Sequence, residues 1–198
     1  MNTILELDHS LFHFINQDLA NGLLDAILPW WRDKKTWIPL YLFLIAFSVF
    51  KYRLKGLFFV LAVILAASLA DVVSSHVMKP AFERVRPCNE AAMANEVRLL
   101  VGCGKAYSFT SSHATNHFAV ATVIALTLGL LFPWLRWVAY GWAATIAFGQ
   151  VYVGVHYPTD VIVGGLIGWI IGNIVAKIYL RFPALSIASP RKNPDPVS

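Results

Sequence analysis

Long apolar stretches separated by short polar segments constrain this chain more than any other feature. They span residues 37–50, 56–78, 118–135, 137–155 and 161–180. A bilayer core of about 30 Å needs about 20 helical residues, so the last four stretches are long enough to cross it and the first is short. With 58% hydrophobic and 14% charged residues, the chain has too little polar surface for a water-soluble globule of its size. The pattern predicts an all-α integral membrane bundle with five transmembrane helices.

The N-terminal segment has a different pattern. Large apolar residues recur at helical intervals over residues 4–28, with acidic and amide residues between them. This spacing predicts an amphipathic helix lying along the membrane interface. A helix packed on the folded domain explains the pattern equally well, and both can hold together. The tryptophans at 30, 31 and 37, around the charged residues 32–35, are typical of an aromatic belt at the lipid headgroups.

Composition also bounds the domain count and the partners. No linker-like segment divides the chain, so residues 1–198 are predicted to form one domain, with residues 182–198 as a disordered cytoplasmic tail. The acidic residues near the N-terminus argue against a cleaved signal. A scattered net charge of +5 argues against nucleic-acid binding, and no Cys/His set has zinc-ligand spacing. We therefore expect no metal and no cofactor, while the oligomeric state stays open.

Three glycines in the last apolar stretch form a helical face without side chains. Gly164, Gly168 and Gly172 recur every four residues, which lets another helix approach closely. Packing inside the bundle is favoured over a homodimer contact.

Counting the spans assigns the loops to two sides of the membrane. Segments 79–110 and 157–159 emerge on one side, and the turns at 51–55 and 134–136 emerge with the C-terminal tail on the other. Basic residues dominate the second side, so the positive-inside rule predicts a cytoplasmic tail and a first side that faces outward. Cys88 and Cys103 would then face an oxidising compartment, where a disulfide can form. Free thiols remain the alternative.

Polar residues gather at the first side in three clusters. Lys79 and Arg86 follow the second apolar stretch, Ser111, Ser112 and His113 precede the third, and His156 and Asp160 lie between the fourth and fifth. Each cluster alone has an ordinary explanation, as snorkelling charge, a helix cap or an interfacial hydrogen bond. Together they offer cations and free helix N–H groups for an anion, and a histidine with a carboxylate to orient it.

These clusters, in this order, resemble the three-part signature of the type 2 phosphatidic acid phosphatase (PAP2) superfamily, which also includes vanadium haloperoxidases. The resemblance covers residues of about 60–170: Lys79 with Arg86-Pro87, then Ser111-Ser112-His113, then residues 154–160 ending in His156 and Asp160. It implies a bacterial inner-membrane phosphatase that acts on undecaprenyl diphosphate or a phospholipid phosphate without a metal.

The resemblance also implies a role for each residue. Phosphate would be bound by Lys79, Arg86, the Ser111 hydroxyl and the amides near Ser112. His156 would attack phosphorus to give a phosphohistidine, Asp160 would orient it, and His113 would protonate the leaving lipid oxygen.

The third part of the signature departs from the family pattern. The family usually has Ser-Arg where this chain has Gly149 and Gln150, so Gln150 supplies a hydrogen bond and no charge. Arg84, Arg98 or Lys105 are the candidates to compensate. The alternative function is a catalytically weakened lipid-phosphate binding or transport protein of the same fold.

Overall fold

A computed structural model describes residues 2–93 and 95–188, and its regular structure in that part of the chain is helical, with no strand. Residues 189–198 of the predicted tail lie outside the described residues. The elements are α1 (Asn2–His13), η1 (Phe14–Asp18), α2 (Gly22–Trp31), η2 (Lys34–Trp37), α3 (Ile38–Tyr52), α4 (Leu54–Val72), η3 (Val73–Met78), α5 (Lys79–Phe82), η4 (Pro87–Asn89), η5 (Ala91–Met93), α6 (Ser112–Leu126), α7 (Leu128–Leu131), α8 (Trp134–Tyr152) and α9 (Pro158–Leu180). The predicted all-α class is confirmed.

Three helices of the described chain are long and apolar enough to cross a membrane. They are Leu54–Phe82, Ser112–Leu131 and Pro158–Leu180, and they contain most of the second, third and fifth apolar stretches. The first and fourth stretches correspond to α3, which has 15 residues, and α8, which has 19. Neither helix meets the same criterion, so the count of five spans stays a prediction.

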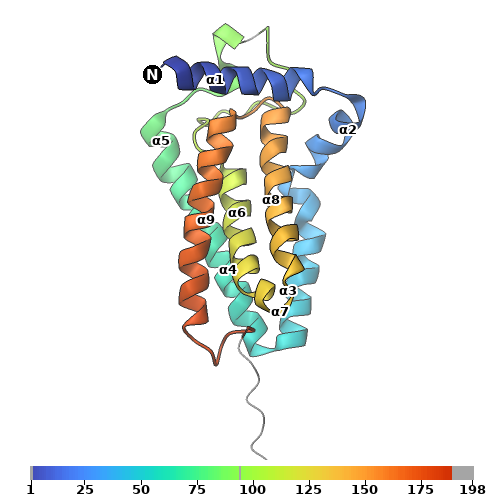
Figure 1. The fold of residues 1–198 in the computed structure, drawn as a ribbon, viewed down its shortest axis with the longest axis vertical. Helices are drawn as coiled ribbons and strands as arrows, with labels where there is room; N and C mark the ends of the chain where they lie inside the picture. Colours follow the sequence, from blue (N-terminus) through green and yellow to red (C-terminus); the bar gives the residue numbers. More distant parts are fainter. Residues whose placement is uncertain (1, 94, 189–198) are drawn as a thin grey trace, which may run out of the picture.

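The helices form a bundle with one end covered by α1, which runs across it (Figure 1). The loops of residues 83–111 and 153–157 lie at this same end, here called the α1 end, and the α3–α4 turn lies at the other. Arg84 Nη1 donates to Thr159 Oγ1 at 2.7 Å, which joins the loop after α5 to the start of α9. The two segments predicted to emerge on one side therefore do lie together.

The N-terminal segment is not the single helix predicted for residues 4–28. Asn21 has extended backbone angles, and its side chain accepts a hydrogen bond from Leu24 N at 3.0 Å. This N-cap starts α2 as a separate helix. In α1 and η1, the stripe of Asp8, Phe12 and Asn16 is buried against the bundle, which supports the packing interpretation. Placement at a membrane interface stays a prediction.

The face formed by Gly164, Gly168 and Gly172 of α9 packs against α6. A Cβ added at Gly168 would lie 2.1 Å from the Thr115 carbonyl oxygen, and one added at Gly172 would lie 2.6 Å from that of Ala119. The predicted close approach is confirmed, with α6 of the same chain as the neighbour. Both helices begin at the α1 end and run in the same direction (Figure 1).

Candidate active site

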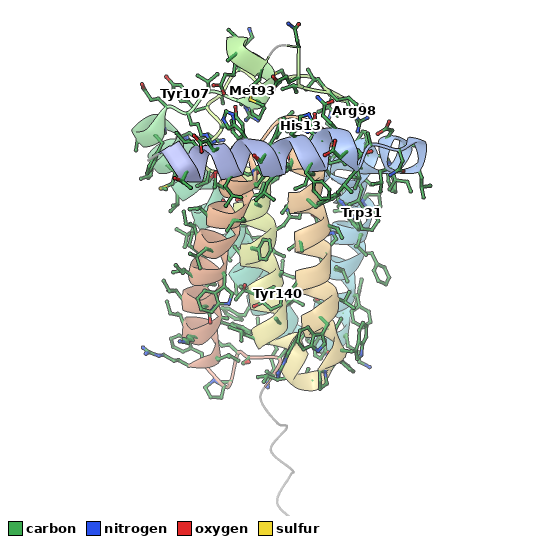
Figure 2. All side chains as sticks on the ribbon, turned by 45° about the horizontal axis from the view of Figure 1, so that its top comes forward. His13, Trp31, Met93, Arg98, Tyr107 and Tyr140 are labelled. Atoms are coloured by element: carbon green, nitrogen blue, oxygen red, sulfur yellow. A yellow bond between two sulfur atoms is a disulfide. The ribbon has the colours of Figure 1, made fainter. Side chains whose placement is uncertain are left out.

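A cavity of about 220 Å³ opens at the α1 end. Its lining comes from the α2–η2 junction, the long loop of residues 83–111, the start of α6, the end of α8 and the α8–α9 loop. The lining residues are Arg32, Arg86, Gly102, Gly104, His113, Gln150, Val155 and His156. A larger hollow of about 450 Å³ runs along α1 beside Leu5, Glu6, His9 and Ser10. Among the described residues, the lining of that hollow includes no Lys or Arg, whereas the smaller cavity is lined by two arginines and two of the predicted histidines. Figure 2 shows the long loop over this end, with Met93, Arg98 and Tyr107 labelled.

His156 lies in the loop between α8 and α9 with its side chain almost fully buried. Its Nδ1 is 3.4 Å from Asp160 Oδ2 and 3.3 Å from Ser108 Oγ, and its Nε2 is 3.2 Å from Arg86 Nη1. The carboxylate favours the proton on Nδ1, which leaves the Nε2 lone pair on the cavity side. Burial lowers the pKa of His156 to about 4, with the Asp160 hydrogen bond opposing that shift. The ring is therefore neutral at pH 7.

Asp160 lies in the first turn of α9 and is fully buried behind His156. Its carboxylate accepts hydrogen bonds from Tyr157 N at 2.9 Å, from Arg84 Nη1 at 2.9 Å and from Ser108 Oγ. These donors match the lone pairs of an ionised carboxylate. The predicted pairing of His156 with Asp160 is present, and Ser108 joins it. Sequence reasoning missed Ser108, which lies 52 positions from Asp160.

The arginines and lysine expected to compensate for Gln150 do not line the cavity. Arg84 bridges Asp160 and Asp8, and its Nη2 is 2.6 Å from Asp8 Oδ2. Arg98 pairs with Asp25 at 2.7 Å. Both guanidinium groups already have carboxylate partners, so the structure gives no support to a compensating role for them, and that role stays a prediction. Lys105 is exposed.

Lys79 and the two serines lie beside the cavity without lining it. The buried Lys79 Nζ donates to the carbonyls of Tyr107 at 2.8 Å and Thr110 at 3.0 Å, so it shapes the loop that leads into α6. The Ser112 hydroxyl lies 2.9 Å from Ser74 Oγ. Ser111 is the N-cap of α6, and its buried Oγ has no hydrogen-bond partner among the described residues. A phosphate-binding role for the Ser111 hydroxyl stays a prediction.

His113 lies in the first turn of α6 and lines the cavity, as predicted. One turn later, His117 stacks parallel to it, with ring centroids 6.3 Å apart. His117 Nδ1 is 2.7 Å from the His113 carbonyl oxygen, and its Nε2 is 3.4 Å from the Tyr41 hydroxyl. His117 therefore buttresses the ring of His113 from inside the bundle.

Gln150 is fully buried in α8 and lines the cavity, and its role in phosphate binding stays a prediction. Its Oε1 accepts two hydrogen bonds from Arg32, from Nε at 3.1 Å and from Nη2 at 2.8 Å. Sequence reasoning missed Arg32, because it lies among residues interpreted as an interfacial belt. The sequence does hold one signal for Arg32: the absence of a cation at position 150 indicates that another basic residue has to supply the charge.

A disulfide between Cys88 and Cys103 joins two parts of the long loop. The prediction of a bridge is confirmed over the alternative of free thiols. Gly102 and Gly104, which flank Cys103, both line the cavity, so the bridge fixes one of its walls. Among the described residues, no group of three or more His, Cys, Asp or Glu side chains could hold a metal ion.

Two named relatives share this sequence over most of their length. The chain is 32% identical over 182 residues to a lipid A 4'-phosphatase of Porphyromonas gingivalis, covering 91% of this chain and 76% of the relative. It is 33% identical over 165 residues to an undecaprenyl-diphosphatase of Sulfolobus acidocaldarius, covering 81% of this chain and 73% of the relative.

A solved structure supports the fold. The crystal structure of a transmembrane PAP2 type phosphatidylglycerolphosphate phosphatase from Bacillus subtilis matches with a TM-score of 0.70 at 24% identity, covering 91% of this chain and 88% of that one. The model of the PAP2 superfamily matches residues 55–183. The chain is thus a membrane protein that belongs to the PAP2 superfamily, and it is a phosphatase of that family.

Proposed function

We propose that this protein hydrolyses a lipid phosphate or diphosphate through a phosphohistidine on His156. The observation that carries the proposal is the placement of that ring. His156 is buried between Asp160 and Arg86, with Nε2 on the cavity side. A neutral imidazole held in one tautomer by a carboxylate suits a nucleophile, and the adjacent guanidinium suits the charge on a transferring phosphoryl group.

The reaction has two steps. His156 Nε2 forms a bond to phosphorus as the bond from phosphorus to the lipid oxygen breaks, and His113 gives its proton to that oxygen. A water then attacks the phosphohistidine, His113 takes a proton from this water, and the N–P bond breaks to release phosphate. Both histidines line the same cavity, and Asp160 stabilises the positive charge that His156 acquires in the first step.

The substrate class follows from the membrane setting and from the relatives. The names of the relatives include a lipid A 4'-phosphatase and an undecaprenyl-diphosphatase, so lipid A phosphates join undecaprenyl diphosphate and phospholipid phosphates as candidates. All of these carry a phosphate at the membrane surface on an apolar anchor. A cavity of about 220 Å³ has room for a phosphate and a small part of a headgroup.

The same proposal includes the orientation in the membrane. The protein crosses the bacterial inner membrane five times, α1 lies at the membrane interface, and the cavity faces the periplasm. Large exposed apolar side chains on α3 and α8 support it, among them Phe43 and Phe50 of α3 and Trp137 of α8. Basic residues at the end opposite α1 and the disulfide at the α1 end agree with this orientation.

Phosphate release from a panel of these lipids, measured with purified protein in detergent and EDTA, tests the proposal. We expect turnover by the wild type, its loss in His156→Ala, and an acid-labile phosphoenzyme in the wild type alone. Turnover that survives His156→Ala would contradict the mechanism.

The alternative of a binding or transport protein rests on the uncharged Gln150. Lipid binding without release by the wild type would favour it.

A further inference from the structure

We propose that Arg32 is a phosphate-binding residue of this site and takes the place of the arginine that position 150 lacks. The inference rests on the proposed function, because it assigns a residue to the same phosphate. It concerns a residue outside the three family motifs, carried by the segment between α2 and η2.

Both positions at which the third motif departs from the family pattern contact Arg32. Gln150 Oε1 accepts hydrogen bonds from its Nε and Nη2. A Cβ added at Gly149 would lie 3.4 Å from the Arg32 Cβ, so Arg32 packs against the place where the family has a serine side chain. An arginine at 150 would instead set two guanidinium groups against each other. Gly149 leaves room for the Arg32 side chain and Gln150 binds it, so we treat the three residues as one structural unit.

The cavity has an excess of positive charge, which a bound anion would neutralise. Arg32 and Arg86 both line it, and neither forms an ion pair with a described carboxylate. Arg84 and Arg98, at the same end of the bundle, each have an aspartate partner. Burial and the like charge of Arg86 lower the pKa of Arg32, yet an arginine stays protonated in proteins. Partly buried charges are normally paired, and here the partner expected is phosphate.

Arg32 is also held in place. Asn21 caps α2, and the buried Leu28 packs with Tyr152, Val153 and Val155. Gln150 holds two donors of the guanidinium, and no described residue accepts a hydrogen bond from the third nitrogen, Nη1. The side chain of Gln150 is held in turn, but its Nε2 is buried without a described partner. Arg32 Nη1 and Gln150 Nε2 thus provide two donors for phosphate oxygens.

A charge-relocation cycle tests the proposal, with Arg32→Gln, Gln150→Arg and the double variant compared with the wild type in full-length protein in detergent. The turnover probe is undecaprenyl diphosphate, and the binding probe is the rise in unfolding temperature caused by inorganic phosphate. Arg32→Gln should lower kcat/KM about 100-fold, as loss of a transition-state donor does, and reduce the phosphate-induced rise. The double variant should recover to within about tenfold of the wild type, since the charge has moved across the same contact.

The control is Lys35→Gln, which removes an exposed charge from the same segment and should leave both readouts unchanged. Arg32→Gln protein that keeps wild-type turnover and phosphate response would overturn the proposal. If Arg32→Gln does not fold, Gln150→Arg tests the assignment independently, because it should lower turnover while Arg32 is present, and a gain would refute the assignment. If the wild type hydrolyses no lipid, the proposed function fails, and the phosphate response still decides the role of Arg32.

Discussion

Asp8 in α1 and Arg84 in the loop after α5 form an ion pair, with Asp8 Oδ2 2.6 Å from Arg84 Nη2. The other terminal nitrogen of Arg84 binds Asp160, which orients His156. Asp8 also accepts hydrogen bonds from the backbone N and the hydroxyl of Thr159, at 2.8 and 2.6 Å. The N-terminal helix is therefore linked through one guanidinium to the carboxylate that contacts His156.

Replacing Asp8 with alanine should weaken both the fold and the site. Arg84 loses one of its two carboxylates and the start of α9 loses an acceptor, so we expect a loss of about 2 kcal/mol in unfolding free energy. Turnover should fall severalfold, because Asp160 is less firmly held. Glu6→Ala is the matched control, since Glu6 is an exposed acid on the same helix. Equal unfolding temperatures for the two variants in detergent would contradict the role given to Asp8.

Adding one methyl group at two glycines should have opposite effects. Gly168→Ala drives a Cβ against the Thr115 carbonyl oxygen, so α6 and α9 must separate, at a cost of about 1–3 kcal/mol. At Gly141 of α8 the added Cβ meets nothing within 4 Å, and alanine there should be neutral or stabilising, because it favours the helix. Thermal unfolding in detergent compares them. A stable Gly168→Ala protein would argue against the backbone contact.

The titration of His156 should lie well below that of an ordinary histidine. Burial lowers its pKa to about 4, so the neutral, nucleophilic ring persists at pH 5, where an imidazole of pKa about 6.5 is almost fully protonated. NMR of protein labelled with ¹⁵N-histidine measures this without substrate, and the signal lost in His156→Gln identifies the residue. In Asp160→Asn the midpoint should fall further, since the carboxylate hydrogen bond raises this pKa. A midpoint near 6.5 in the wild type would exclude a buried neutral ring.

The sequence predicted the helical class, the common end of the two polar loops and the pairing of His156 with Asp160, because hydropathy and short motif spacings are local. It did not predict the break before α2, although Asn21-Gly22 is a capping signal, since the apolar spacing runs through it. It did not predict the ion pairs of Arg84 with Asp8 and Asp160, because nothing local distinguishes an arginine that pairs with carboxylates from one that binds phosphate. Arg32 was missed because its partner, Gln150, lies 118 positions away.

The contact between α6 and α9 has an electrostatic consequence. The two helices run in parallel with backbones in contact, and both N-termini lie at the α1 end. Each N-terminus carries a partial positive charge of about half an elementary unit from its aligned peptide dipoles. At α9 this charge is offset by the first-turn carboxylate of Asp160, whereas the first turn of α6 holds no acidic residue. An anion bound beside the start of α6 would complete this compensation, so we expect phosphate to strengthen the contact between the two helices and to raise the unfolding temperature of the bundle.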